Sequence, residues 1–297
     1  MAKWWLLLTG FVLWLAVGFV ARPPRATDAQ AQEAPHSPTR IVSMAPNLTE
    51  ILFALGLDAQ IAGVTNESDY PPAAIRKRRV GSFWQPGIEP IIATRPDLVV
   101  TLGFQQHRDL ARRLDRMGCD CRVMDVETVD DLFDTIRVLG RSTGRQVEAR
   151  RLENEMRLKL VRIRETTTDL PRVKVLWVVQ REPLRVAGRE TFVNEIIELA
   201  GGENAIGPTL HKYPPIGAEQ VIASSPEVII EPAMVGTDLD GQRRQAMAYW
   251  SRFENVPAVA NGRICVVDGD LVSRLSPRLP AGVGTVARCL YPSLFGE

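Results

Sequence analysis

Two kinds of segment alternate along most of the chain. Strand-length apolar runs occupy residues 40–44, 60–65, 97–103 and 121–126. Amphipathic segments with helical spacing occupy residues 48–57, 106–118 and 128–140. Short apolar runs are typical of strands buried on both faces, and the amphipathic segments are typical of the helices that cover them. The first half of the chain is therefore predicted to be an α/β lobe with a mostly parallel sheet.

From Ser142 to about Thr168 the pattern changes to one long charged stretch without Gly or Pro after Gly144. Its apolar positions, which fall at three- to five-residue spacing, are Val147, Leu152, Met156, Leu160 and Ile163. This spacing predicts a helix with a narrow buried stripe. Strands and helices then alternate again to the end of the chain. We therefore predict two similar α/β lobes joined by one long connector helix, with Ser142 as its N-cap.

One stretch of the first half has a counterpart in the second half. IEPIIATRPDLVV runs from Ile88 to Val100, and AEQVIASSPEVII runs from Ala218 to Ile230. Each predicts a short helix, a proline and a buried strand, and Glu89 and Glu219 occupy matching places at the start. The repeat indicates that the two lobes share one architecture.

Composition and net charge indicate a globular protein and argue against one class of partner. A chain of 297 residues has room for about two domains, and its 45% hydrophobic and 24% charged residues are ordinary for a globular protein. The formal net charge is only +1. A nucleic-acid partner is therefore not expected.

The N-terminus has its own pattern. Lys3 precedes a nearly unbroken apolar run, which is followed by a polar segment rich in Pro and Ala. We interpret residues 1–31 as an export signal peptide or an uncleaved anchor, and residues 32–39 as a linker. In both cases the body of the protein lies outside the cytoplasm, and the sequence leaves the choice between cleavage and tethering open.

The cysteines and histidines indicate no metal site. Cys119 and Cys121 lie two residues apart in a predicted strand, where a disulfide between them would be strained, so we interpret them as core thiols. Whether Cys265 in a strand pairs with Cys289 in the last helix is left open. The three histidines are scattered without ligand spacing.

Two short motifs were weighed as signs of an enzyme. GRSTG at 140–144 matches the G-x-S-x-G pattern, but that serine must follow a buried strand, whereas a predicted helix precedes Ser142. GGENAIG at 201–207 lacks the complete glycine pattern of a dinucleotide site and the lysine of a P-loop. We therefore expect no catalytic residue and no enzymatic activity.

Six segments in order carry a resemblance to a known family. They are RIVSMAPNLTEILFALGL, VTNESDYPP, GIEPIIATRPDLVV, LAGGENAIG, GAEQVIASSPEVII and GDLVSRLSPR. Together they resemble the periplasmic substrate-binding proteins of ABC importers for cobalamin and iron chelates, and are most similar to the vitamin B12-binding type. The resemblance covers nearly all of the chain beyond Thr39. It implies two Rossmann-like lobes, here 40–141 and 171–297, bridged by a connector helix at 142–170.

The resemblance also implies a function. The protein is expected to capture a corrinoid, or a related metal chelate, between its lobes and to deliver it to a membrane permease with its ATPase. A binding protein for haem or a ferric siderophore, and a tethered receptor that does not transport, remain alternatives. No intrinsic cofactor is expected, and a monomer is.

Ligand contacts are expected on loops at the carboxyl ends of the strands. The candidate ligand-binding residues are Pro46, Glu67, Phe83, Trp84, Tyr213, Asp270, Leu271, Val272, Ser273 and Arg274. Three aromatic residues among them, Phe83, Trp84 and Tyr213, would form walls for a macrocycle, and Asp270 and Arg274 would supply polar contacts. At Glu67, Phe83, Leu271 and Val272 the chain departs from the cobalamin binders, which leaves the identity of the chelate open.

The repeated glutamates gain a role from the resemblance. In the family, an exposed glutamate on each lobe docks on arginines of the permease, and Glu89 and Glu219 occupy those places. A carboxylate at the start of a helix also suits the helix dipole, so the residues alone would favour a local role. With the resemblance, permease docking is the expected role of both.

Overall fold

The computed structural model describes residues 37–233 and 238–295. The signal peptide or anchor expected at 1–31, and most of the linker expected at 32–39, therefore lie outside the described residues. Within the described ranges, no helix combines the length and apolarity that crossing a membrane requires. The described residues from Ser37 onward belong to one compact unit.

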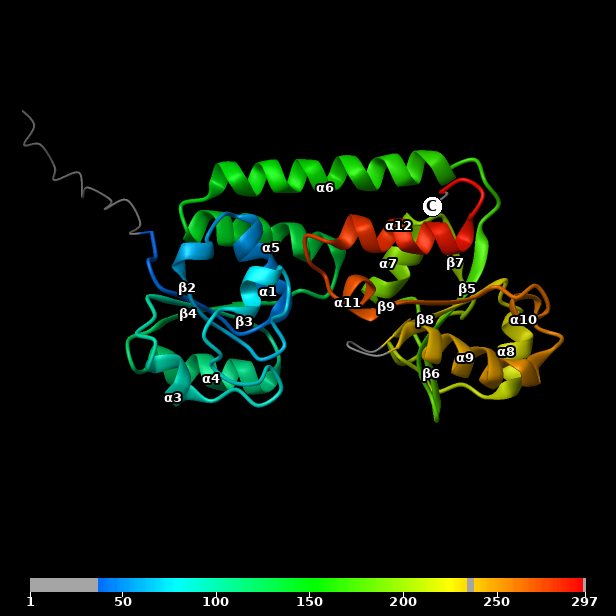
Figure 1. The fold of residues 1–297 in the computed structure, drawn as a ribbon, viewed down its shortest axis with the longest axis horizontal. Coiled ribbons are helices and arrows are strands. Elements are labelled where there is room, and N and C mark those ends of the chain that lie inside the picture. Colours follow the sequence, from blue (N-terminus) through cyan, green and yellow to red (C-terminus); the bar gives the residue numbers. More distant parts are fainter. Residues whose placement is uncertain (1–36, 234–237, 296–297) are drawn as a thin grey trace, which may run out of the picture. The chain divides into compact units, whose positions relative to one another are not determined.

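The N-terminal lobe is built on a parallel sheet with strand order β2-β1-β3-β4. Its strands are β1 (Ile41–Ser43), β2 (Ile61–Val64), β3 (Leu98–Leu102) and β4 (Asp120–Met124). Its helices are α1 (Pro46–Ala54), α2 (Pro72–Ile75), α3 (Ile88–Ile92), α4 (Gln105–Asp115) and α5 (Val129–Ser142), with a 3₁₀ turn at Asp58–Gln60. α1 and α5 cover one face of the sheet, and α3 and α4 cover the other (Figure 1).

The C-terminal lobe repeats this plan with additions. The order of its sheet is β6-β5-β8-β9, and β7 also pairs with β5. Its strands are β5 (Val173–Arg181), β6 (Leu184–Val186), β7 (Gly202–Asn204), β8 (Val228–Ala233) and β9 (Ile264–Asp268). Its helices are α7 (Phe192–Leu199), α8 (Ala218–Ser224), α9 (Leu239–Trp250), α10 (Pro257–Ala260), α11 (Gly269–Val272) and α12 (Leu279–Leu290), with a 3₁₀ turn at Ser251–Phe253.

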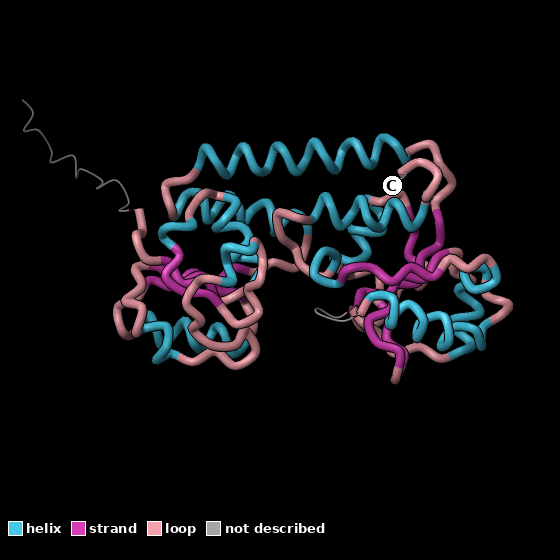
Figure 2. Tube along the Cα trace, in the orientation of Figure 1, coloured by secondary structure: helices cyan, strands magenta, loops and turns pink. Residues whose placement is uncertain are grey.

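One helix, α6 (Gln146–Thr167), runs along both lobes (Figures 1 and 2). The expected two-lobed α/β fold with a long connector helix is thus confirmed. The expected cap is wrong, because Ser142 is the last residue of α5 and Arg145 is the N-cap of α6. GRSTG consists of the last three residues of α5 and the start of the turn that leads to α6, in which Gly144 has a φ of +70°. Ser142 follows a helix and lacks the strand that a nucleophile elbow requires.

The repeated stretch forms the same structure in each lobe. α3 leads through Arg95 and a proline into β3, and α8 leads through Ser225 and a proline into β8. Arg95 and Ser225 both have left-handed backbone conformations, with φ of 50° and 44°. The next acid, Asp97 or Glu227, accepts backbone N–H groups at the start of the neighbouring strand. The repeat therefore gives each lobe the same backbone path from a short helix into a central strand of its sheet.

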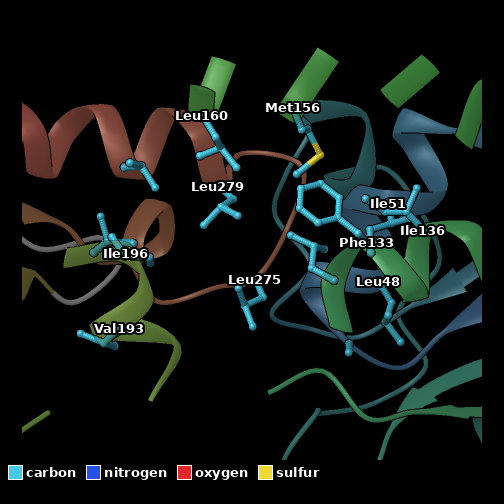
Figure 3. Packing of buried hydrophobic residues seen from close by; sticks show 14 of the residues in the cluster. Leu48, Ile51, Phe133, Ile136, Met156, Leu160, Val193, Ile196, Leu275 and Leu279 are labelled. Atoms are coloured by element: carbon cyan, nitrogen blue, oxygen red, sulfur yellow. The ribbon is translucent and has the colours of Figure 1, made fainter. Parts of the chain in front are cut away.

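The hydrophobic core is continuous between the lobes. Phe133 on α5, Met156 and Leu160 on α6, and Leu279 on α12 belong to one buried cluster, as Figure 3 shows. Leu275 extends the same cluster toward the first lobe. Because apolar contacts run through α6 from one lobe to the other, the connector is part of the core, and large separate movements of the lobes would expose apolar surface.

The cysteines pack against the core. Cys119 and Cys121 are half-buried beside the cluster under α3 and α4, which confirms them as core thiols. Burial raises the pKa of the Cys121 thiol to about 12. Cys265 on β9 and Cys289 on α12 lie close enough for their side chains to share a hydrogen bond, and both are free thiols.

Candidate functional site

A pocket of about 370 Å³ lies where the carboxyl ends of the first-lobe strands meet the second lobe. Its lining residues are Pro46, Asn47, Glu67, Phe83, Trp84, Leu102, Phe104, Val126, Phe192, Ser273, Arg274 and Leu275. Eight of these come from the loops and element ends of the first lobe, and the other four, from Phe192 onward, come from the second. Ligands of open α/β sheets bind at the carboxyl ends of the strands, and this volume is within the usual range of about 300–1,000 Å³.

Aromatic rings form one wall of the pocket. Phe83 meets Trp84 and Phe104 edge to face, with ring centroids 4.9 Å and 5.5 Å apart. Phe83 is nearly buried, whereas Trp84 is 67% exposed. Edge-to-face pairs of this kind add about 0.5–1.5 kcal/mol beyond the area that they bury. Phe83 is therefore held in place by its neighbours, while Trp84 has most of its surface free for a ligand.

A buried histidine fixes this wall from behind. His107 on α4 packs against Phe83, with ring centroids 4.8 Å apart, and its Nε2 lies 2.7 Å from the Phe83 carbonyl oxygen. A carbonyl only accepts, so Nε2 donates, and Nδ1 is left to accept from the Thr101 hydroxyl. Burial lowers the pKa of His107, which favours this neutral form.

Glu67 ties the loop after β2 to the same wall. Its carboxylate accepts the Ser82 hydroxyl at 2.7 Å and the Phe83 backbone N–H at 2.9 Å. Partial burial alone would raise the pKa of Glu67, but these hydrogen bonds outweigh burial and lower it. Glu67 is therefore an ionised side chain in the pocket wall.

An ionic cluster joins the lobes beside the pocket. Arg278 binds the buried Glu50 through two bonds, Nη2 to Oε1 at 2.6 Å and Nε to Oε2 at 2.9 Å. Arg274 reaches Asp69 at 3.0 Å and Asp270 at 2.6 Å. Glu50 and Asp69 belong to the first lobe, and the other three belong to the second. Burial, more than any neighbouring charge, raises the pKa of Asp270. The paired geometry explains how these charges are tolerated at a partly buried boundary.

The structure brings together six of the ten predicted ligand residues. Pro46, Glu67, Phe83, Trp84, Ser273 and Arg274 all line the pocket. The remaining four lie outside its lining. Val272 is wholly buried in the core, Leu271 packs against it, and Asp270 holds Arg274. Tyr213 is 36% exposed, and the neighbouring Lys212 pairs with Glu127 of the first lobe at 2.6 Å, so this loop lies at the boundary between the lobes.

Six lining residues were not predicted. They are Asn47, Leu102, Phe104, Val126, Phe192 and Leu275. For three of them a signal was present, because Leu102 ends β3, Phe104 follows it, and Val126 follows β4, all at carboxyl ends of strands. Phe192 and Leu275 line the pocket because of how the second lobe packs against the first, and no local sequence pattern predicts that packing.

The repeated glutamates are both exposed, in the first turns of α3 and α8. Among the described residues, neither forms an ion pair. They lie on different lobes (Figure 1). Within the same part of the chain, no group of three His, Cys, Asp or Glu side chains is arranged to hold a metal ion.

Comparisons with known proteins give the family. The profile of the family described as periplasmic binding protein matches residues 41–271. An uncharacterized ABC transporter substrate-binding lipoprotein, YvrC of Bacillus subtilis, is 28% identical over 93% of this chain and 88% of its own. A vitamin B12-binding protein of Vibrio parahaemolyticus is 26% identical over 80% of this chain and 84% of its own.

A solved structure agrees with these relatives. A periplasmic haem-binding protein from Pseudomonas aeruginosa superposes with a TM-score of 0.72 at 27% identity, covering 86% of this chain and 94% of its own. All three relatives are named as binding proteins, and none as an enzyme. The family profile spans most of the chain and includes nine of the twelve residues that line the pocket. The chain belongs to the periplasmic binding protein family.

Proposed function

We propose that the protein is the extracytoplasmic binding component of an ABC importer and that it captures a corrinoid in the pocket between its lobes. The observation that carries this proposal is the pocket itself, in which Phe83, Trp84, Phe104 and Phe192 surround a few polar groups. Flat macrocycles bind aromatic walls through buried apolar area, and placed polar groups fix their rims. Asn47 and Ser273 can exchange hydrogen bonds with the amides that surround a corrin.

The coordination chemistry of the pocket favours a corrinoid over haem. Haem iron in proteins is held by His, Cys, Met or Tyr. Among the described residues that line the pocket, none is of these four types. A corrinoid that carries its own axial ligands needs no such side chain. Haem remains the second candidate because a haem-binding protein is among the structural relatives.

Delivery completes the proposed function. Glu89 and Glu219 present one carboxylate on each lobe, and we propose that they dock on cationic side chains of the permease. Two anions fixed on one compact body define orientation and register as well as affinity. The protein would act as a monomer with this permease and its ATPase, in the periplasm or tethered outside the membrane by its N-terminal segment.

Isothermal titration tests the ligand. The purified protein is titrated with cyanocobalamin, cobinamide, haemin and a ferric siderophore under the same conditions. We expect the two corrinoids to bind at micromolar or lower concentration and the others more weakly. Failure of every chelate to bind below about 1 mM, which corresponds to only about −4 kcal/mol, would contradict the proposed function.

A further inference from the structure

The charges around the pocket do not balance. Of the described residues that line it, only Glu67 and Arg274 are charged. Whether the pocket can accept a charged ligand therefore depends on how far each of these two charges is already neutralised by the protein.

The positive charge of Arg274 is already paired with carboxylates of the protein. Arg274 has a side chain only 17% exposed, and it contacts Asp69 at 3.0 Å, Asp270 at 2.6 Å and Glu50 at 3.9 Å. The nearby Arg278 is occupied by both oxygens of Glu50. These three carboxylates and two guanidinium groups leave one negative charge in excess. Arg274 is therefore not available as the partner of an anionic ligand.

The carboxylate of Glu67 accepts hydrogen bonds, but no cation of the described residues pairs with it. Among the described residues, the donors to Glu67 are uncharged: the Ser82 hydroxyl and the Phe83 amide, with smaller contributions from the Thr65 hydroxyl and the backbone N–H of Glu67 itself. Such bonds orient a carboxylate and keep it ionised, but they leave its negative charge in place. In the part of the chain that the structure describes, no Lys, Arg or His forms an ion pair with Glu67.

Three cations lie on segments next to the lining residues. Arg79 donates to the backbone carbonyls of Thr65 and Ser68, at 2.6 Å and 2.8 Å, and forms no ion pair with Glu67 among the described residues. Arg108 is paired with Asp125, next to the lining residue Val126, at 2.5 Å. Lys212 is paired with Glu127 at 2.6 Å. The Arg108–Asp125 and Lys212–Glu127 pairs therefore contribute no net charge.

We propose that Glu67 is a specificity-determining residue that makes the pocket select uncharged or cationic chelates and reject anionic ones. A ligand carboxylate that entered the pocket would lose water and meet an unneutralised carboxylate, with no free cation among the described lining to offset the repulsion. An amide-rimmed or cationic chelate escapes this cost. The inference rests on the proposed function, because it takes the pocket to be the ligand site.

Ligands matched in shape but not in charge test the proposal. The full-length protein is titrated with cyanocobalamin, which has no net charge, and with its monocarboxylate, in which one side-chain amide has become a carboxylate. Haemin and its dimethyl ester form a second pair, in which the propionates are charged or masked. The variants are Glu67→Gln, which keeps the shape and removes the charge, and Ser82→Ala, which keeps the charge and removes one hydrogen bond.

In whichever series binds, we expect the wild type to prefer the uncharged member by about tenfold or more. Glu67→Gln should reduce this preference to within about threefold, mainly by improving the affinity for the anionic member, while Ser82→Ala should leave the preference unchanged. An equal preference in the wild type and in Glu67→Gln would overturn the inference and leave the proposed function intact. The absence of binding in both series would overturn the proposed function and the inference with it.

Discussion

Trp84 is the side chain that offers a ligand the most aromatic surface, because it is 67% exposed and rests against the nearly buried Phe83. Trp84→Ala should weaken corrinoid binding by about 1–3 kcal/mol through lost apolar contact. Trp84→Phe should lose less, and Leu210→Ala, at a side chain 98% exposed outside the pocket lining, should lose nothing. Calorimetric titration of the three variants checks this. Equal affinities for Trp84→Ala and Leu210→Ala would remove Trp84 from the site.

His107 makes stability depend on pH. Because burial lowers the pKa of folded His107, the unfolded chain takes up a proton at about pH 6.5, before the folded chain does. The free energy of unfolding should therefore fall as the pH drops below about 6.5, and stop falling once the lower folded pKa is passed. Above that window the imidazole is neutral in both states and contributes no slope.

His107→Gln isolates this contribution, because glutamine can still donate to the Phe83 carbonyl but does not titrate. Asp270 and Glu195, whose pKa values are raised mainly by burial, act in the opposite direction and are common to both proteins. Urea unfolding at pH 7 and pH 5 should show the wild type losing about 1–2 kcal/mol more than the variant. Equal losses would show that His107 is not the titrating group.

Among single residues, the sequence predicted part of the first-lobe side of the pocket. Glu67 lies in one of the segments that carry the resemblance, Phe83 and Trp84 lie between two of them, and all three line the pocket. The sequence did not predict that Arg274 pairs with the first lobe, because its partner Asp69 lies 205 positions away along the chain. Contacts of that kind depend on how the lobes meet, and no local pattern of residues reports them.

At the scale of elements, the close contact between α5 and α6 carries a test. A Cβ added to Gly140 would lie 2.5 Å from the Cβ of Ala149 and 3.1 Å from the carbonyl oxygen of Arg145. Gly-to-Ala changes inside helices usually stabilise by about 1 kcal/mol. Gly140→Ala should instead destabilise by about 1–3 kcal/mol, because it forces the two helices apart.

A matched control lies in α12. A Cβ added to Gly284 would meet only Ile163, at an ordinary 3.8 Å, so Gly284→Ala should show the usual helix stabilisation. Adding Ala149→Gly to Gly140→Ala should recover part of the loss, because it removes the clashing atom. Urea unfolding of the four proteins measures these effects. Stabilisation by Gly140→Ala alone would show that the helices are not in close contact there.

The same contact explains where the prediction of α6 failed. The expected apolar stripe began at Val147, but Val147 is 68% exposed and Ala149 is buried. Small size, which lets α6 approach Gly140, decided the buried position there, and a hydrophobicity pattern does not register it. Long strands and helices were predicted well because their periodicity extends over many residues. β6 and β7, with three residues each, are too short to show a period.

For the whole molecule, Glu89 and Glu219, which we propose as the docking residues, should act on transport and leave ligand binding unaffected. Neither Glu89 nor Glu219 lines the pocket, and both are exposed. Replacing either with Lys should leave the dissociation constant for the chelate within about twofold, but should weaken docking to the permease through like-charge repulsion. The double reversal should be the more severe change.

Glu165→Lys, at an exposed position of α6, provides a charge-matched control that should dock normally. Binding of each variant to its permease in proteoliposomes, and ATP-driven uptake of the chelate, measure the effect. Compensating acidic substitutions on the permease should restore uptake at least in part. Normal docking of the variant with both charges reversed would show that the two glutamates have only a local role at the start of their helices.

Corrinoid binding between the lobes is best tested by a crystal structure of the protein grown with cyanocobalamin, with diffraction data collected at the cobalt absorption edge. Cobalt scatters anomalously, so its position is located independently of the protein atoms. We expect one strong cobalt peak between the lobes, with the corrin ring in contact with Phe83, Trp84 and Phe192. A cobalt peak on any other surface, or an empty pocket at saturating ligand, would contradict this expectation.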